Sequence, residues 1–194
     1  YNTTIITTTD NRMFGVGPNR DGQLGGGTTS KKTEVTEIFA GKRAVRFSMG
    51  DTHTAFVTPD LKVFMCGRNN EGQFGDGTTS SRSSPTQVMT THDIADVFCG
   101  YRTTFFRTTT GKLYATGYNN EGQLGLNDTT NRSAPEEVPY SENVCSVTGS
   151  LFHNHTIFRR AYVGSTRVDI ERTSQDRQGL VVDAEVSVER ASNM

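Results

Sequence analysis

The segment GRNNEGQFGDGTT, residues 67–79, has two further versions in this chain, GPNRDGQLGGGTT at 17–29 and GYNNEGQLGLNDTT at 117–130. Equivalent glycines, asparagines and glutamines stand 50 residues apart in the three copies. A glycine-rich loop that cradles a phosphate normally occurs once in a domain, and no copy contains G-x-x-x-x-G-K-[ST]. Three copies at one period favour a structural loop of a repeated fold over a phosphate-binding site.

Each loop follows a segment with the pattern of strand, turn and strand. These segments are TTIITTTDNRMFGVG (3–17), HTAFVTPDLKVFMCG (53–67) and TTFFRTTTGKLYATG (103–117). β-Branched and aromatic residues favour strands, and Asp10-Asn11, Pro59-Asp60 and Thr110-Gly111 are good turn formers. With further strands expected around 86–89 and 95–98, each unit holds about four short strands.

Four strands per unit at this period predict an all-β fold of propeller blades. A single blade cannot bury both of its faces, so it must stack on its neighbours. We therefore expect the apolar strand residues, including Ile5-Ile6, Ala55-Phe56 and Phe105-Phe106, to form the faces between blades.

Composition limits the classes of function. The chain of 194 residues has a net charge of −1, whereas a general nucleic-acid binder normally carries a basic excess. No run of apolar residues approaches the roughly 18 residues of a membrane span. The odd number of cysteines, Cys66, Cys99 and Cys145, without a C-x-x-C pair, favours a reducing compartment, which predicts a cytoplasmic or nuclear location.

The pattern G-x-N-x-x-G-Q-L-G resembles that of the regulator of chromosome condensation repeat family. It is followed here by Pro85, Val88 and Gly100, and an H-T pair stands at His53-Thr54. The resemblance covers about residues 1–160 and implies a propeller, which in this family typically has seven blades. Here it implies a partial β-propeller of about three to four four-stranded blades.

The chain departs from the family pattern after its third copy. A fourth unit begins at Val144, needs two extra residues to align His155-Thr156 with His53-Thr54, and then loses the pattern. Three and a half units cannot close a seven-bladed ring. We expect the chain to be a piece of a longer protein, with completion by another chain as the alternative.

Residues 161–194 differ in composition from the repeats and predict a C-terminal hairpin or extended tail. Apolar and polar residues alternate in TRVDIER (166–172) and in VVDAEVSVER (181–190), which is typical of strands with one wet face. We predict a hairpin of roughly 166–172 and 180–189 that covers the edge of the last blade, because an open propeller must protect that edge. A mobile tail is the alternative.

The sequence contains no signature of catalysis, of a cofactor site or of a metal site. No serine lies in G-x-S-x-G, and Cys66 sits within a repeated strand, where a buried inert thiol is expected. His153 and His155 are two residues apart, but no third zinc ligand stands near them. His155, which aligns with His53, is expected to hydrogen-bond the backbone between blades.

What varies between the repeats is the surface. Polar and aromatic residues differ from copy to copy at the loop tips and at the turn before the second strand, and Tyr and Arg are favoured at binding hot spots. These candidate partner-binding residues are Arg20, Asp21, Arg68, Asn70, Glu71, Tyr101, Arg102, Tyr118, Asn120 and Glu121. For any one of them alone, an ordinary solvated turn is the simpler interpretation.

The sequence therefore predicts a non-enzymatic interaction module or scaffold in a larger eukaryotic assembly, cytoskeletal or nuclear. The resemblance implies a rival function, since some relatives are exchange factors for the small GTPase Ran and act through an elaborated loop. The units here keep a uniform spacing of 50 residues without such a loop. Chromatin or DNA binding is a third possibility, against which the charge balance argues.

Overall fold

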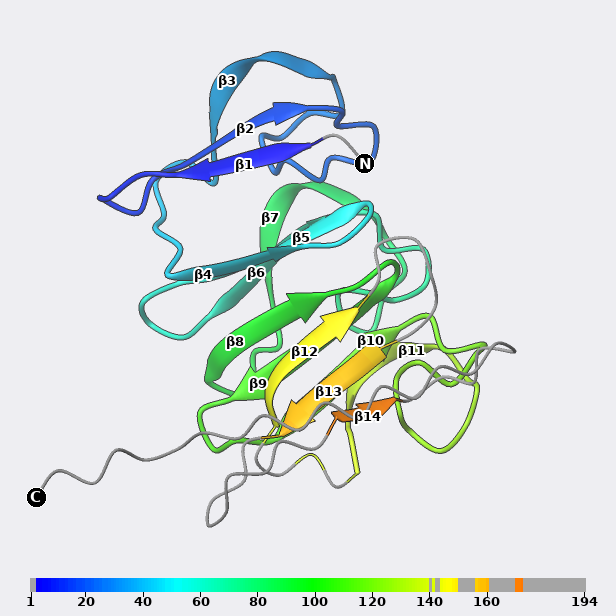
Figure 1. The fold of residues 1–194 in the computed structure, drawn as a ribbon. Coiled ribbons are helices and arrows are strands. Elements are labelled where there is room, and N and C mark those ends of the chain that lie inside the picture. The colour runs from blue at the N-terminus through cyan, green and yellow to red at the C-terminus, as the bar shows by residue number, and fades with distance from the viewer. Residues whose placement is uncertain (1–2, 140, 142–143, 150–155, 161–169, 173–194) are drawn as a thin grey trace, which may run out of the picture.

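The computed structural model describes residues 3–139, 141, 144–149, 156–160 and 170–172, and these residues form antiparallel sheets (Figure 1). The described part of the chain contains no helix with the length and apolarity needed to cross a membrane. All its regular elements are strands, as the sequence predicts.

The strands form four consecutive sheets, which we number as blades 1 to 4. Blade 1 has three strands, β1 (Thr4–Thr7), β2 (Met13–Gly17) and β3 (Lys32–Ile38). Blade 2 has four, β4 (Arg46–Met49), β5 (His53–Val57), β6 (Val63–Gly67) and β7 (Arg82–Val88). Blade 3 has β8 (Ile94–Cys99), β9 (Thr103–Thr108), β10 (Leu113–Gly117) and β11 (Arg132–Glu137). The described part of blade 4 has β12 (Val144–Gly149), β13 (Thr156–Arg160) and β14 (Ile170–Arg172).

The blades stack face to face in chain order, from blade 1 in dark blue to β12–β14 in yellow and orange (Figure 1). Within each complete blade the strands lie side by side in the same order as in the sequence, so each of these blades is a meander. This arrangement is a partial β-propeller, and it confirms the fold class and the four strands per unit that the repeat predicts.

The repeated glycines hold each loop against the next blade. Gly22 and Gly72 have φ values of 80° and 82°, which L side chains rarely adopt. A Cβ at Gly22 would lie 2.5 Å from Ser83 Cα, and one at Gly72 would lie 2.5 Å from Ser133 Cα. The glycines therefore serve the left-handed turn and the close approach of neighbouring blades, which is the structural role expected of them.

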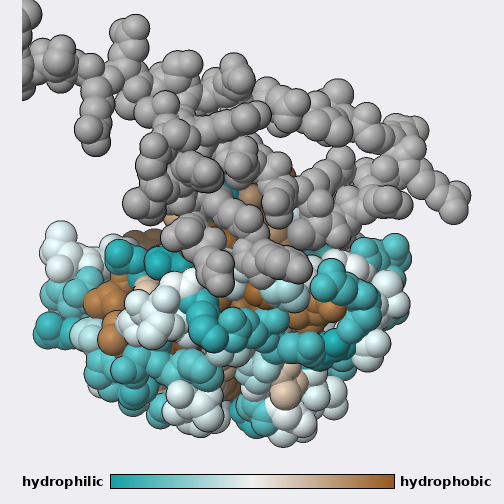
Figure 2. Space-filling model, turned by 90° about the horizontal axis from the view of Figure 1, so that it is seen from below, coloured by the Kyte–Doolittle hydropathy of each residue, from teal (hydrophilic) through white to brown (hydrophobic). Residues whose placement is uncertain are grey.

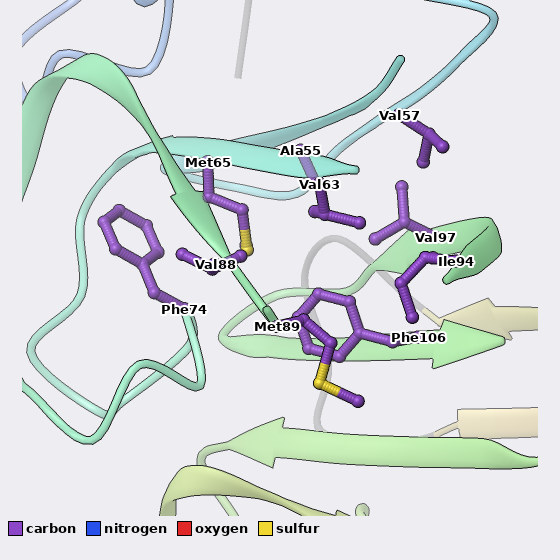
Figure 3. Packing of buried hydrophobic residues seen from close by; sticks show 10 residues of the cluster. All are labelled: Ala55, Val57, Val63, Met65, Phe74, Val88, Met89, Ile94, Val97 and Phe106. Carbon is purple, nitrogen blue, oxygen red and sulfur yellow. The ribbon is translucent and has the colours of Figure 1, made fainter. Parts of the chain in front are cut away.

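The core consists of apolar layers between successive blades. Between blades 2 and 3, Ala55, Val57 and Met65 share one buried cluster with Phe106, in which Phe74 lies on its loop at one end and Met89 lies near Phe106 (Figure 3). Burial of each such aromatic side chain contributes about 2–3 kcal/mol of transfer free energy. Corresponding clusters lie between blades 1 and 2 and between blade 3 and β12–β13. Figure 2, which views the molecule from the side of blade 4, shows apolar residues within a hydrophilic border.

One expected core residue is exposed. Ile6 lies at the position of Phe56 and Phe106, both of which are fully buried against the preceding blade. Its side chain is 42% exposed, so the expectation that it packs between blades is wrong. The reason is that Ile6 points away from blade 2, and no described blade covers that side. Its neighbour Ile5 packs against the layer between blades 1 and 2.

The predicted C-terminal hairpin falls largely outside the described residues. Ile170–Arg172 forms β14, within the first predicted strand, and pairs with β13 in antiparallel register. Residues 166–169 and 180–189 are not among the described residues, and neither are His153 and His155.

Candidate functional site

Two kinds of turn meet on one rim of the stacked blades. The turn between β4 and β5 binds the loop after β6, because Arg68 N donates to Thr52 O at 2.9 Å. The same bond recurs one blade further, where Tyr118 N donates to Arg102 O at 3.0 Å. Variable residues far apart in sequence are thereby held side by side. We call Asp51, Arg68, Glu71, Tyr101, Arg102 and Tyr118 the polar rim.

Arg102 lies at the centre of the polar rim. Its Nη1 lies 3.4 Å from Glu71 Oε1, in the loop of the preceding blade. Its guanidinium carbon lies 4.9 Å from the ring centroid of Tyr101 and 5.8 Å from that of Tyr118. Asn131 Nδ2 donates to the other Glu71 oxygen at 3.4 Å. The side chains of Arg102 and Glu71 are half-buried, at 30% and 22% exposure, so the cluster is partly preformed.

Asp51 extends the polar rim toward blade 1. Burial raises the pKa of its carboxyl, and the charge of Asp21 acts in the same direction, whereas Arg102 and Arg68 oppose the shift. Among the described residues, the buried atoms Asp51 Oδ1 and Arg68 Nε have no hydrogen-bond partner. Buried polar atoms in folded proteins nearly always have partners, so these groups are suited to bind water or a ligand atom.

The loops beneath the polar rim are held by an invariant element of the repeat. Asn69 is fully buried, accepts a hydrogen bond from Phe74 N at 2.8 Å and donates to Thr78 O at 3.0 Å. Asn19 and Asn119 make the equivalent pairs of bonds in their own loops. Each asparagine ties both ends of its loop, so the variable tips stand on a rigid base.

The structure brings together about half of the predicted surface residues. Arg68, Glu71, Tyr101, Arg102 and Tyr118 join the polar rim, and Asp21 lies close enough to act on the pKa of Asp51. Arg20, Asn70, Asn120 and Glu121 are exposed at the loop tips. The sequence reasoning missed Asp51. The signal that could have found it is its register, because Asp51 stands one repeat before Tyr101.

Two titratable side chains are buried in the core next to the turns of the polar rim. His53 is buried in blade 2, and its Nε2 lies 2.9 Å from Thr104 Oγ1 in blade 3. His53 thus links two blades through a side-chain hydroxyl, whereas His155, for which a bond between blades was predicted, lies outside the described residues. Burial raises the pKa of the Cys66 thiol, which makes it a weak nucleophile. No three His, Cys, Asp or Glu side chains gather into a possible metal site in the described part of the chain.

The four-stranded blades, their glycine loops and the bonds between blades define a propeller repeat protein. The model of the regulator of chromosome condensation (RCC1) repeat matches residues 10–57, 62–107 and 110–158. The chain therefore belongs to the RCC1 repeat family. A second RCC1 repeat model matches residues 94–123.

Solved structures show the same fold. Human WBSCR16 is similar with a TM-score of 0.70 and 21% identity over 87% of this chain and 44% of that one. Prp20p from Saccharomyces cerevisiae, reported with its binding to Gsp1p and histones, has a TM-score of 0.65 and 18% identity over 77% of this chain and 40% of its own. Yeast RCC1 (Prp20) bound to Kap60 has a TM-score of 0.63 and 19% identity. This chain thus spans less than half of each relative. No curated protein matches the sequence.

Proposed function

We propose that this chain is a non-enzymatic module that binds a protein partner through the polar rim. The observation that carries the proposal is Arg102, which lies over the ring of Tyr101 in its own turn and over that of Tyr118 and beside Glu71 in two other loops. Tyrosine supplies a large contact area with little conformational freedom to lose, and tyrosine and arginine are both enriched at binding hot spots. The rigid asparagine-tied loops reduce the entropy cost of binding further.

The location of such a module and the kind of partner follow from the same features. The free, buried thiol of Cys66 is typical of a protein in a reducing compartment such as the cytoplasm or the nucleus, and the net charge near zero is compatible with either. A scaffold role, cytoskeletal or nuclear, fits a repeat fold that carries its variable residues on rigid loops. Neither a cofactor nor a metal is part of the proposed function.

The test compares rim variants with a variant on the opposite rim. Arg102→Ala and Tyr118→Ala remove the centre of the polar rim, whereas Lys62→Ala removes an exposed ion pair to Asp93, 2.7 Å long, at the other end of blade 2. Tagged chains would be expressed in eukaryotic cells and their bound proteins quantified by mass spectrometry. A partner that is lost from both rim variants and kept by Lys62→Ala supports the proposal. Equal capture by all variants would contradict it.

A regulator of a Ran-like small GTPase is the second candidate. Its support is the similarity to Prp20p, which was described with its binding to Gsp1p. The three described loops keep a constant length within the repeat, so any element that acts on a nucleotide site would lie elsewhere in a longer protein. A nucleotide-release assay with Ran decides the question, because an exchange factor accelerates release and a scaffold leaves its rate unchanged.

Binding to chromatin or DNA is disfavoured by charge. Nucleic-acid affinity depends on neutralising phosphates with Lys and Arg, and the chain carries 20 such residues against 21 acidic ones. A titration against duplex DNA at low salt should therefore give no saturable binding.

A further inference from the structure

Two successive boundaries between blades present the same arrangement of loop and turn on the rim. The loop of the earlier blade supplies an acidic residue, which is Asp21 between blades 1 and 2 and Glu71 between blades 2 and 3. Asp21 N donates to Gln23 Oε1 at 3.1 Å, and Glu71 N donates to Gln73 Oε1 at 2.9 Å. The two acidic residues therefore stand at equivalent places and are held in the same way.

The later blade of each boundary adds residues from the turn between its first two strands and from its loop. These residues are Asp51, Thr52 and Arg68 at the first boundary, and Tyr101, Arg102 and Tyr118 at the second. The backbone bonds that join turn and loop are the same at both boundaries, with lengths of 2.9 and 3.0 Å. The boundaries thus share one backbone arrangement, and the difference between them lies in the side chains.

At the boundary between blades 2 and 3, a guanidinium of the chain itself lies beside the acidic residue. Arg102 Nη1 lies 3.4 Å from Glu71 Oε1, and the guanidinium carbon lies over the rings of Tyr101 and Tyr118. The carboxylate of Glu71 therefore has its counter-charge within the chain. This boundary shows where a cationic side chain sits when the position after the first turn residue provides one.

At the boundary between blades 1 and 2, the position of Arg102 is taken by Thr52, whose short side chain carries no charge. Asp51 and Asp21 lie here together, and burial and then the charge of Asp21 raise the pKa of the Asp51 carboxyl. In the described part of the chain, the buried atoms Asp51 Oδ1 and Thr52 Oγ1 have no hydrogen-bond partner. No salt bridge among those residues includes either carboxylate.

The charges at this boundary do not balance. Arg68 opposes the rise in the pKa of Asp51 that burial causes, so its guanidinium acts on these carboxylates. Arg102 acts in the same direction, but it is already paired with Glu71. Two carboxylates thus face one available guanidinium, and one negative charge is left over beside two buried atoms that can accept hydrogen bonds. A single cation with N–H donors would neutralise the charge and satisfy these acceptors.

We propose that the partner protein places an arginine or lysine side chain beside Asp21, Asp51 and Thr52, at the position that Arg102 fills one blade further. The proposal rests on the proposed function and names the chemistry by which this rim recognises its partner. Guanidinium and ammonium groups carry only donors, which matches a site whose free atoms are carboxylate and hydroxyl oxygens. Charge-assisted bonds of this kind are about twice as strong as neutral ones.

Binding of N-acetyl-arginine amide to the full chain, followed by NMR, tests the site directly. The backbone amide signals of Asp51, Thr52 and Arg68 should shift saturably in the wild type. The citrulline analogue, which has the same shape without the charge, should leave them unchanged at equal ionic strength. Asp21→Asn combined with Asp51→Asn should weaken binding of the arginine derivative by about fivefold or more. Unchanged signals of the buried strand β5 show that the blades remain folded.

Exchanging the residues at the equivalent positions gives a reciprocal test. Thr52→Arg keeps both carboxylates and supplies the cation from the chain itself, so it should abolish binding of the arginine derivative. Arg102→Thr removes the internal cation from Glu71 and should create a second site, with new saturable shifts at Glu71. A general attraction of the derivative to acidic residues would not produce this exchange of behaviour between the two boundaries.

Equal shifts from the citrulline analogue or from sodium chloride, or undiminished binding to Thr52→Arg, would overturn the proposal. Self-association of the wild type that Asp51→Asn abolishes would assign the cation to a second copy of this chain and would also overturn it. The capture of partners by Arg102→Ala and Tyr118→Ala is a separate measurement. If those variants lose a partner but the arginine derivative does not bind, the proposed function stands and only the cation site is refuted.

Discussion

His53 in blade 2 and Thr104 in blade 3 are joined by a bond of 2.9 Å between Nε2 and Oγ1, and this buried pair makes the stack of blades sensitive to pH. Burial lowers the pKa of His53 from 6.5 to about 4. Between these values the unfolded chain binds a proton that the folded chain does not. Stability is therefore fully present above pH 6.5 and falls as the pH drops toward 4, by up to roughly 1.4 kcal/mol per pH unit.

Urea unfolding between pH 7.5 and 5 measures this dependence. His53→Gln removes the titrating group, and its unfolding free energy should be less dependent on pH across this range. A wild type and variant with parallel pH profiles would show that His53 does not titrate as described.

The buried loop asparagine should be a major determinant of stability. Asn69→Ala leaves Phe74 N and Thr78 O without their partners, and each unsatisfied buried backbone group is costly. We expect a loss of about 2–3 kcal/mol in chemical denaturation. The neighbouring exposed residue provides the control, because Asn70→Ala should change stability by no more than about 0.5 kcal/mol. Similar losses in the two variants would contradict the role of Asn69.

Two glycines with the same backbone conformation should differ in their tolerance of a side chain. Gly72 and Gly77 have φ values of 82° and 79°. A Cβ at Gly72 would lie 2.5 Å from Ser133 Cα, whereas no described atom lies within 4 Å of one at Gly77. Gly77→Ala should cost about 1 kcal/mol from the left-handed conformation alone. Gly72→Ala should cost about 1–3 kcal/mol more, because backbone must move. Equal losses in thermal denaturation would argue against close packing of the loop on blade 3.

The three cysteines should differ in reactivity. Burial raises the pKa of the Cys99 thiol to about 12 and also raises that of Cys66, whereas Cys145 is exposed. The thiolate is the reactive form, so a maleimide at neutral pH should label the folded protein once, at Cys145. Cys145→Ser should abolish labelling until denaturant is added. Mass spectrometry that finds label on Cys66 in the folded chain would contradict this packing.

Much of the fold could be predicted because a repeat is a local pattern copied at a fixed spacing. Gly22, Gly72 and Gly122 indicate the same turn in three successive repeats, and apolar pairs such as Ala55-Phe56 indicate the strands between these turns. The same logic failed at Ile6, where the pattern is kept but the blade it would contact is not among the described residues. A repeat pattern identifies a face and does not show whether a neighbour covers it.

The candidate site was only partly predictable. Variation between copies pointed to Arg68, Glu71, Arg102 and Tyr118, but it also pointed to Asn120, which lies exposed at a loop tip. The contact of Arg102 with Glu71 joins residues 31 positions apart in two different blades. Variation between copies does not show which residues lie close together in space, so it could not distinguish the polar rim from the ordinary loop tips.

The sequence by itself determined the repeat unit, its strands, its glycine turns and the family, because each of these depends on residues close together in the chain. The tertiary structure decided which variable residues meet at the polar rim and which thiols are inert. These properties depend on how one blade lies on the next. The stacking arises from the summed burial of apolar layers, and no single stretch of sequence contains that information.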